Sequence, residues 1–176
     1  MDDHSFGLGD RCGYAFAGAR MNAWPHNKIY NNVHWEILRH SMEPAGWLFT
    51  RITNHHESVV RHIDASAGEL AVVTAKTAES NWYALTTRRM IGVLDGVNFD
   101  IAADKITRCD FGQNAKGHGG VQLATANVTL SGGKSMNFEF ETGRAWMAPE
   151  YYTSWWVRKY AILDSLKFDP NLKTTA

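Results

Sequence analysis

The stretch Trp82-Tyr83-Ala84-Leu85-Thr86-Thr87-Arg88-Arg89-Met90-Ile91 decides the fold of this 176-residue chain. It contains a short β-favouring run, residues 82–87, and the start of a second, residues 90–94, and only two arginines separate them. Runs that follow one another so closely predict a pair of strands joined by a tight turn. Asp95-Gly96 comes next, and this dipeptide favours the two-residue turn of a further hairpin. We therefore expect a meander of antiparallel strands around this stretch.

Further short β-favouring runs continue on both sides of this pair. We predict seven strands, over residues 70–74, 82–87, 90–94, 97–101, 105–111, 121–130 and 135–142. In the last run, Phe138 and Phe140 alternate with Glu139 and Glu141, which predicts that the phenylalanines share one face and the glutamates the other. Seven short strands at hairpin spacing are typical of an antiparallel sheet that curls or closes.

The chain before residue 66 has a helical periodicity instead. Ile29, Val33 and Ile37 lie four residues apart, which predicts a helix over residues 27–40. Apolar residues at helical spacing predict a second helix over residues 47–63. We accordingly divide the chain into a loop-rich and helical extension (1–66), a sheet domain with its C-terminal helix (67–170) and a tail (171–176).

A long amphipathic helix is expected after the last strand. Pro149 suits the first helical position, because proline has no backbone N–H to leave unbonded there. Tyr152, Trp156 and Leu163 then form one apolar seam of a helix over residues 150–167. The sequence thus predicts an α+β fold in which this helix covers the sheet.

Charge excludes two classes of function. The chain has 18 basic and 18 acidic residues, so its formal net charge is zero. A protein that binds nucleic acid by neutralising phosphates needs a basic excess, and so does a polybasic membrane-surface protein. We therefore expect neither nucleic acid nor an anionic membrane as the partner.

The cysteines and the first residues predict a cytoplasmic protein. Cys12 and Cys109 lie far apart and share no metal-ligand spacing, which indicates reduced thiols. The start, Met1-Asp2-Asp3-His4, is acidic, whereas a signal peptide begins with a positive segment. No apolar run approaches the roughly 20 residues that span a membrane.

The stretch from Trp82 to Ile91 resembles the "lvlTnkRli" strand pair of bacterial pleckstrin-homology-like domains. The segment from Ile101 to Ile106 resembles the isoleucine-rich stretch before the next strand of such domains. The resemblance covers about residues 68–166. It implies a seven-stranded antiparallel barrel, or two curved sheets, capped by the long C-terminal helix and preceded here by a helical N-terminal extension. It also implies a binding scaffold rather than an enzyme.

Some relatives in that family bind inositol phosphates through a basic loop between the first two strands. The corresponding loop here, residues 76–81, contains one lysine and one glutamate. A multiply charged phosphate needs several converging cations. We therefore do not expect binding to phosphoinositide membranes.

Histidines before residue 66 provide the alternative of a metal-dependent hydrolase. His55-His56-Glu57 and His62 resemble the zinc-protease pattern H-E-x-x-H, but the histidine after Glu57 comes five residues later instead of three. His34 and His40, on the first predicted helix, are the other candidate ligands. Because the spacing does not match, we expect no metal and no cofactor.

Two acidic residues of the last strand are the other enzyme-like feature. Glu139 and Glu141 are two positions apart, about 6.6 Å by the rise of a strand, which suits a pair of catalytic carboxylates. Their alternation with phenylalanine fully explains them as the polar face of a half-buried strand. We interpret them as structural.

Aromatic residues crowd the start of the C-terminal helix. Tryptophan, tyrosine and arginine are enriched at binding hot spots, so we predict a partner-binding surface here. Its predicted members are Trp146, Tyr151, Trp155, Arg158 and Tyr160. Trp155 lies about 100° around the helix from Trp156, so it faces either a partner or the N-terminal helices.

The leading hypothesis is a non-enzymatic protein that binds another protein, and an immunity-type protein that neutralises a toxin is one version of it. A small-ligand or lipid-binding barrel is a further alternative. The sequence does not indicate which protein the partner is.

Overall fold

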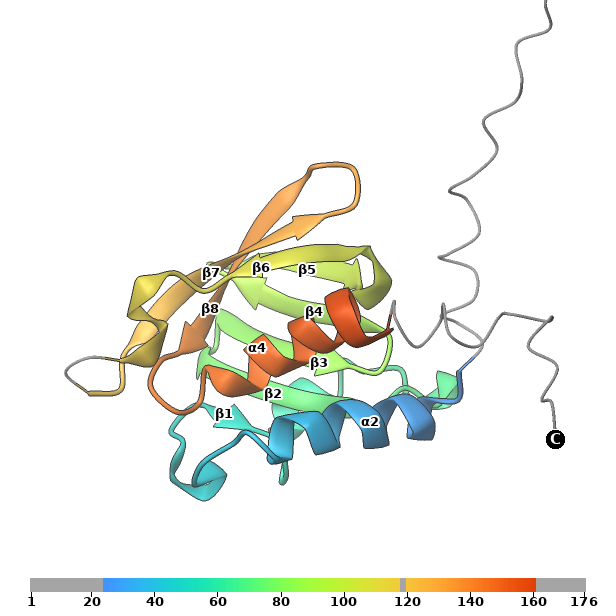
Figure 1. Ribbon diagram of the computed structural model, residues 1–176, viewed down its shortest axis with the longest axis horizontal. Helices are drawn as coiled ribbons and strands as arrows, with labels where there is room; N and C mark the ends of the chain where they lie inside the picture. Colours follow the sequence, from blue (N-terminus) through green and yellow to red (C-terminus); the bar gives the residue numbers. More distant parts are fainter. Residues whose placement is uncertain (1–23, 118–119, 161–176) are drawn as a thin grey trace, which may run out of the picture.

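The computed structural model describes residues 24–117 and 120–160 of the chain. In this part, eight strands form two antiparallel sheets (Figure 1). The five-stranded sheet has the order β1 (Thr50–Arg51), β2 (Ala71–Ala78), β3 (Asn81–Thr86), β4 (Arg89–Leu94), β5 (Val97–Ala102). The three-stranded sheet has the order β6 (Ile106–Asp110), β7 (Leu123–Leu130), β8 (Ser135–Glu141).

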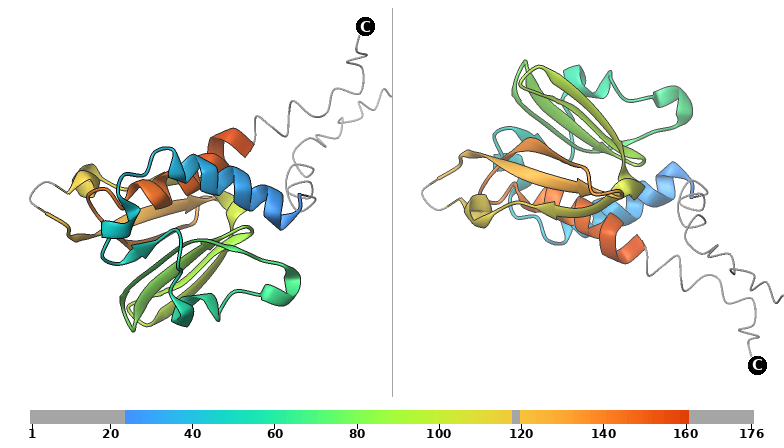
Figure 2. Two further views of the ribbon diagram at one scale, coloured as in Figure 1. Left: turned by 90° about the horizontal axis from the view of Figure 1, so that it is seen from below. Right: turned by 90° about the horizontal axis from the view of Figure 1, so that it is seen from above.

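All seven predicted strands are present, and the short β1 is an addition that the sequence did not predict. The strands do not close into a barrel, because no described backbone pairing joins β5 to β6. The chain turns between them through a 3₁₀ segment, η3 (Ala103–Lys105). Figure 2 shows the two sheets meeting at this corner. The expected antiparallel sheet therefore exists as two separate sheets.

The hairpin between β4 and β5 follows the prediction from Asp95-Gly96. Both residues have positive φ, 50° and 79°, as the tight primed turn requires. Gly92 on β4 is also required, because a Cβ atom there would lie 2.5 Å from Cζ of Phe99 on β5. The pairing of these two strands thus depends on the absence of a side chain at position 92.

One hydrophobic core joins both sheets and the helix α2 (His26–Leu38). Tyr83 of β3 meets Phe138 of β8 edge to face, with ring centroids 5.1 Å apart. As predicted, Ile29, Val33 and Ile37 share the buried side of α2. The N-terminal extension therefore contributes to the same core as the sheets.

The C-terminal helix α4 (Met147–Ser154) continues as a π-helical segment, η5 (Trp155–Tyr160). Tyr152 and Trp156 are buried, as the predicted seam requires, whereas Leu163 and the predicted helix end at 167 lie outside the described residues. Pro149 is the third residue of α4, not the first. It still lies in the first turn, where no backbone N–H is needed.

The predicted helix over residues 47–63 is wrong. This segment contains β1, a bend and the four-residue helix α3 (Glu57–Val60). Asn54 in its middle has a φ of 48°, which is incompatible with a continuous right-handed helix. Leu48, predicted on the apolar stripe, is exposed.

The carboxylate of Glu141 holds the start of this segment in an extended form. It accepts hydrogen bonds from the backbone N–H groups of Leu48, Phe49 and Thr50, at 2.7–2.8 Å. Glu141 is buried, so its interpretation as part of a solvated polar face is wrong. Glu139 is half-buried and accepts a hydrogen bond from the Thr77 hydroxyl. The two glutamates therefore join β8 to the edge of the other sheet.

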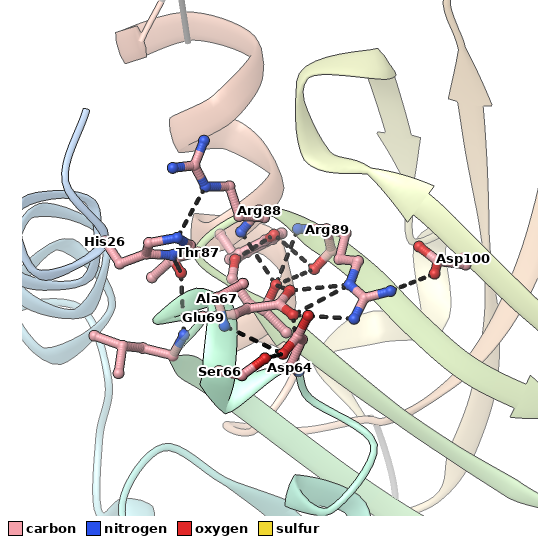
Figure 3. A network of polar contacts seen from close by, with 12 residues as sticks. His26, Asp64, Ser66, Ala67, Glu69, Thr87, Arg88, Arg89 and Asp100 are labelled. Carbon is pink, nitrogen blue, oxygen red and sulfur yellow. Dashed lines mark hydrogen bonds and ion pairs between the residues drawn. The ribbon is translucent and has the colours of Figure 1, made fainter. Parts of the chain in front are cut away.

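A second buried carboxylate, Glu69, lies beneath the turn between β3 and β4 (Figure 3). Arg89 donates to it from Nε and Nη2 at 3.0 Å, and the Thr86 hydroxyl donates at 2.5 Å. The backbone N–H of Asp64 completes the set at 3.2 Å. Burial by itself would raise the pKa of Glu69, but these hydrogen bonds outweigh it and hold that pKa below its usual value.

Both long helices attach to this same turn. The Tyr152 hydroxyl of α4 donates to the Thr86 carbonyl at 2.8 Å. Nε2 of His26, at the start of α2, accepts from Arg88 Nε at 3.2 Å, and its Nδ1 lies 2.5 Å from the Thr87 hydroxyl. The stretch from Trp82 to Ile91 is thus where the five-stranded sheet joins α2 and α4. Neither helix, nor any other in the described residues, is long and apolar enough to cross a membrane.

The Glu69 site generates a first prediction. Glu69→Gln removes the charge opposite Arg89 and should lower the free energy of unfolding by about 2–4 kcal/mol. The full cost of breaking a buried pair is about 3–5 kcal/mol, and the partly exposed Arg89 reduces it. Urea unfolding measures the change, with Glu57→Gln on the surface as control.

Because the folded-state pKa of Glu69 is lowered, the wild-type protein should lose this contribution to its stability as the pH falls below about 4.3, and the Glu69→Gln variant should lose less. Equal losses for both glutamine variants would contradict the role of Glu69.

The Glu141 site generates a second prediction. Glu141→Gln replaces one acceptor oxygen by an amide that cannot accept from the backbone of residues 48–50. It should cost about 2–3 kcal/mol, since hydrogen bonds to a buried charge are strong and three are affected. Thermal and urea unfolding measure the loss. Glu139→Gln is the matched control on the same strand and should cost less, because Glu139 binds side-chain donors only. The opposite ranking would show that the 48–50 segment does not depend on this carboxylate.

Candidate functional site

A cavity of about 320 Å³ lies along α4 where this helix packs beside α2. Its lining combines aromatic rings with charged side chains. The lining residues are Glu36, Trp146, Met147, Glu150, Tyr151, Ser154, Trp155 and Arg158. The volume is in the lower range of pockets that hold a small ligand or an inserted side chain.

Helical spacing places these groups on one side of α4. Met147, Glu150, Tyr151, Ser154 and Arg158 recur every three or four residues, the interval at which side chains of a helix align. Glu36 is the one contribution from α2 to the described lining. Since both helices attach to the turn between β3 and β4, the same turn positions the two walls of the cavity.

The polar groups of the cavity are held by short local contacts. The Ser154 hydroxyl donates to Glu150 Oε1 at 2.9 Å. Glu36 Oε1 lies 3.5 Å from His40 Nε2, and the His40 ring stacks on Tyr151 with centroids 4.1 Å apart and planes 4° apart. Tyr151 is therefore held against α2 in a defined orientation.

Four of the five predicted partner-binding residues line this single cavity: Trp146, Tyr151, Trp155 and Arg158. The fifth, Tyr160, has a side chain outside the described part of the chain. The idea of Trp155 as an exposed contact is wrong, because only 2% of its surface is exposed and it packs edge to face on Trp156 at 4.9 Å. A π-helix closes its hydrogen bonds over five residues, so its turns are wider than those of an α-helix. In this segment both neighbouring tryptophans are buried.

The acidic lining was not predicted. Glu36 is the single acidic residue between residues 27 and 40, and it directly precedes Ile37 of the apolar stripe. That position beside the buried face is the signal that could have identified it. Glu150 was predicted only as part of the helix surface, and its closeness to Glu36 depends on the packing of α2 against α4.

Exposed apolar side chains lie on α2, the helix that contributes Glu36 to the cavity, and directly after it. Trp35 is 59% exposed, and the Arg39 guanidinium lies 4.7 Å from its ring centroid. Arg39 Nη1 is also 4.0 Å from Glu36 Oε2, which connects this stacked pair to the cavity lining. Leu38 on α2 and Met42, which follows the helix, are exposed as well.

The histidines of the alternative metal site are distributed over separate contacts. His40 stacks on Tyr151, His62 stacks on Trp82, and His55 Nδ1 lies 3.3 Å from the Thr74 hydroxyl. His34 stacks on Tyr30 and interacts electrostatically with His55. Within residues 24–117 and 120–160, no three His, Cys, Asp or Glu side chains come together as metal ligands would.

Cys109 lines a neighbouring cavity that shares Glu150, Ser154 and Arg158 with the α2–α4 cavity. Burial raises the pKa of its thiol to about 12, and the nearby Glu150 carboxylate acts in the same direction. Nucleophilic cysteines need the thiolate form near neutral pH. Cys109 therefore does not have the properties of a reactive thiol.

Half-buried histidines generate a pH prediction. Burial lowers the pKa of His26, His34, His55 and His56 in the folded protein. The unfolded chain binds these protons from about pH 6.5 downward, so stability should fall as the pH falls from 6.5 through each lowered pKa. Urea midpoints measured between pH 7.5 and 5 test this loss.

His34→Phe is the informative variant for this prediction. Nδ1 of His34 is buried without a hydrogen-bond partner among the described residues, so phenylalanine keeps the ring stacked on Tyr30 and loses no bond at that atom. Its stability at pH 7.5 should equal or exceed that of wild type, and its midpoint should fall less on acidification. A steeper loss in the variant would contradict this account.

Relatives of known function would provide a further guide to the role of this cavity. Comparisons of the chain with protein-family models, with curated proteins and with solved structures found no significant match. A function for this chain therefore has to be inferred from its own side chains.

Proposed function

We propose that the chain is a non-enzymatic protein-binding protein that receives a partner protein at the cavity between α2 and α4. The observation that carries the proposal is that contacts through Arg39 link the lining of this cavity to an exposed tryptophan on α2. Trp146 and Tyr151 line the cavity, and the exposed Trp35 beside it is linked through Arg39 to Glu36. Tryptophan, tyrosine and arginine are the residues on which binding energy concentrates in protein interfaces.

The proposal includes a pleckstrin-homology-like fold. Four strands of one antiparallel sheet, β2 to β5, precede three strands of a second, β6 to β8, and a C-terminal helix follows. This order supports the resemblance of residues 82–91 to strand pairs of that family. In this interpretation α2 and β1 are additions to the fold of the family, and the cavity forms where the added α2 packs beside α4.

A partner protein fits these observations better than a small molecule. Trp35, Leu38 and Met42 are exposed and lie outside the lining of the cavity, so a small ligand bound in the cavity would leave them exposed. A partner protein contacts more surface than a small ligand and would cover Trp35 as well. Neutralisation of a toxin in the cytoplasm is one version of the proposal, and it rests on the neutral charge of the chain and on analogy.

Trp35→Ala tests the proposal without threatening the fold, because Trp35 is mostly exposed. A photo-crosslinking residue at position 151, introduced in cells of the source organism, should capture a discrete protein. The same residue at position 125, on the exposed side of β7, should not. The captured protein is then purified and its affinity for the chain measured by calorimetry.

Trp35→Ala should weaken that complex about tenfold or more, the effect of truncating a hot-spot residue. Val97→Ala on β5, which truncates an equally exposed apolar side chain, should leave the affinity unchanged. Trp155→Ala is unsuitable because Trp155 is part of the core. Equal affinities for the two alanine variants would overturn the proposed surface.

A further inference from the structure

The α2–α4 cavity brings two carboxylates together with three aromatic rings. Glu36 and Glu150 are the carboxylates, and Trp146, Tyr151 and Trp155 are the aromatic residues. The side chain of Glu36 is only 8% exposed. Two carboxylates in an otherwise largely apolar wall make the affinity of the cavity depend on the charge and hydrogen-bonding groups of its occupant.

An apolar anchor would be a poor occupant. It would remove water from the Glu150 carboxylate without offering that group a hydrogen-bond donor in return. Burial of a charged group without new bonds costs several kcal/mol, which would offset the gain from apolar contact. An anion would add like charge to the same wall, with Arg158 as the single cation of the described lining.

A guanidinium group suits both the carboxylates and the aromatic rings of this lining. It can donate two parallel hydrogen bonds to a carboxylate, and its plane stacks on aromatic faces, where the ring quadrupole attracts a cation. The protein already uses this contact at the rim, where Arg39 stacks on Trp35 beside Glu36. The volume of about 320 Å³ accommodates one such side chain.

We infer that the cavity receives an arginine side chain of the partner protein, with Glu150 as its main carboxylate acceptor and Trp146 and Tyr151 as its aromatic walls. This inference rests on the proposed function. Arg39 Nη1 lies 4.0 Å from Glu36 and already compensates part of its charge, and His40 Nε2 lies 3.5 Å from the same carboxylate. The hydrogen bond from Ser154 leaves the second oxygen of Glu150 as the acceptor for the incoming group.

The probe is the blocked tripeptide acetyl-Gly-Arg-Gly-amide, titrated into the whole protein and followed by tryptophan fluorescence and by NMR. Two further peptides replace arginine by citrulline, its neutral isostere, and by norleucine. We expect a dissociation constant in the millimolar range for the arginine peptide, about that of a single inserted side chain. The citrulline and norleucine peptides should bind at least tenfold more weakly.

Three variants test whether charge at the cavity determines the affinity for the arginine peptide. Glu150→Gln should weaken binding of the arginine peptide about fivefold or more, because a charged acceptor is lost. Arg158→Gln should strengthen it, because a like charge at the cavity is removed. Glu79→Gln, an exposed carboxylate paired with Lys76 on the first sheet, is the matched control and should change nothing.

Equal binding of the arginine and citrulline peptides, or tighter binding of norleucine, would overturn the inference. So would an unchanged affinity of Glu150→Gln, or a weakened affinity of Arg158→Gln. If these failures occur while Trp35→Ala still weakens the captured complex, the proposed function stands without the arginine. If the arginine peptide binds as expected but no captured protein depends on Trp35, the proposed function fails, and the cavity binds a small cationic ligand instead.

Discussion

The buried carboxylate of Glu69 is the group on which the arrangement of this protein depends. It neutralises Arg89 and accepts from Thr86 at the turn between β3 and β4, so the turn has one defined shape. The Tyr152 hydroxyl binds a carbonyl of this turn, and His26 binds its Thr87 hydroxyl. The positions of α4 and α2, and therefore the cavity between them, follow from the geometry of four consecutive residues.

Glu141 is a second buried carboxylate that satisfies hydrogen-bond donors, here the backbone N–H groups of residues 48–50. Residues 48–50 would otherwise present unpaired backbone N–H groups where they cross the end of β8, and unpaired buried donors are costly. One carboxylate satisfies three of them. Two acidic residues that a sequence pattern would place in solvent or in a catalytic pair therefore serve as backbone and side-chain acceptors, because the two sheets meet along this edge.

The candidate site is a product of helix packing. Aromatic residues of α4 bury one side against the sheets, and α2 covers the next side without filling it completely. Glu36 and Glu150 come from helices more than a hundred residues apart in the chain, yet they line the same cavity. On this combination of rings and carboxylates rests our proposal that a chain with zero net charge selects a charged group locally.

The sequence by itself determined the local structure: seven strands, the first helix, the tight turn at Asp95-Gly96 and the aromatic cluster at the start of α4. These follow from short-range periodicity and turn chemistry, which act between neighbouring residues. Tertiary structure alone decided the division into two sheets, the loss of the helix predicted over 47–63, the burial of Trp155 and the acidic wall of the cavity. Each of these depends on groups far apart in the chain, such as Glu141 and the backbone of residues 48–50, whose meeting no local pattern encodes.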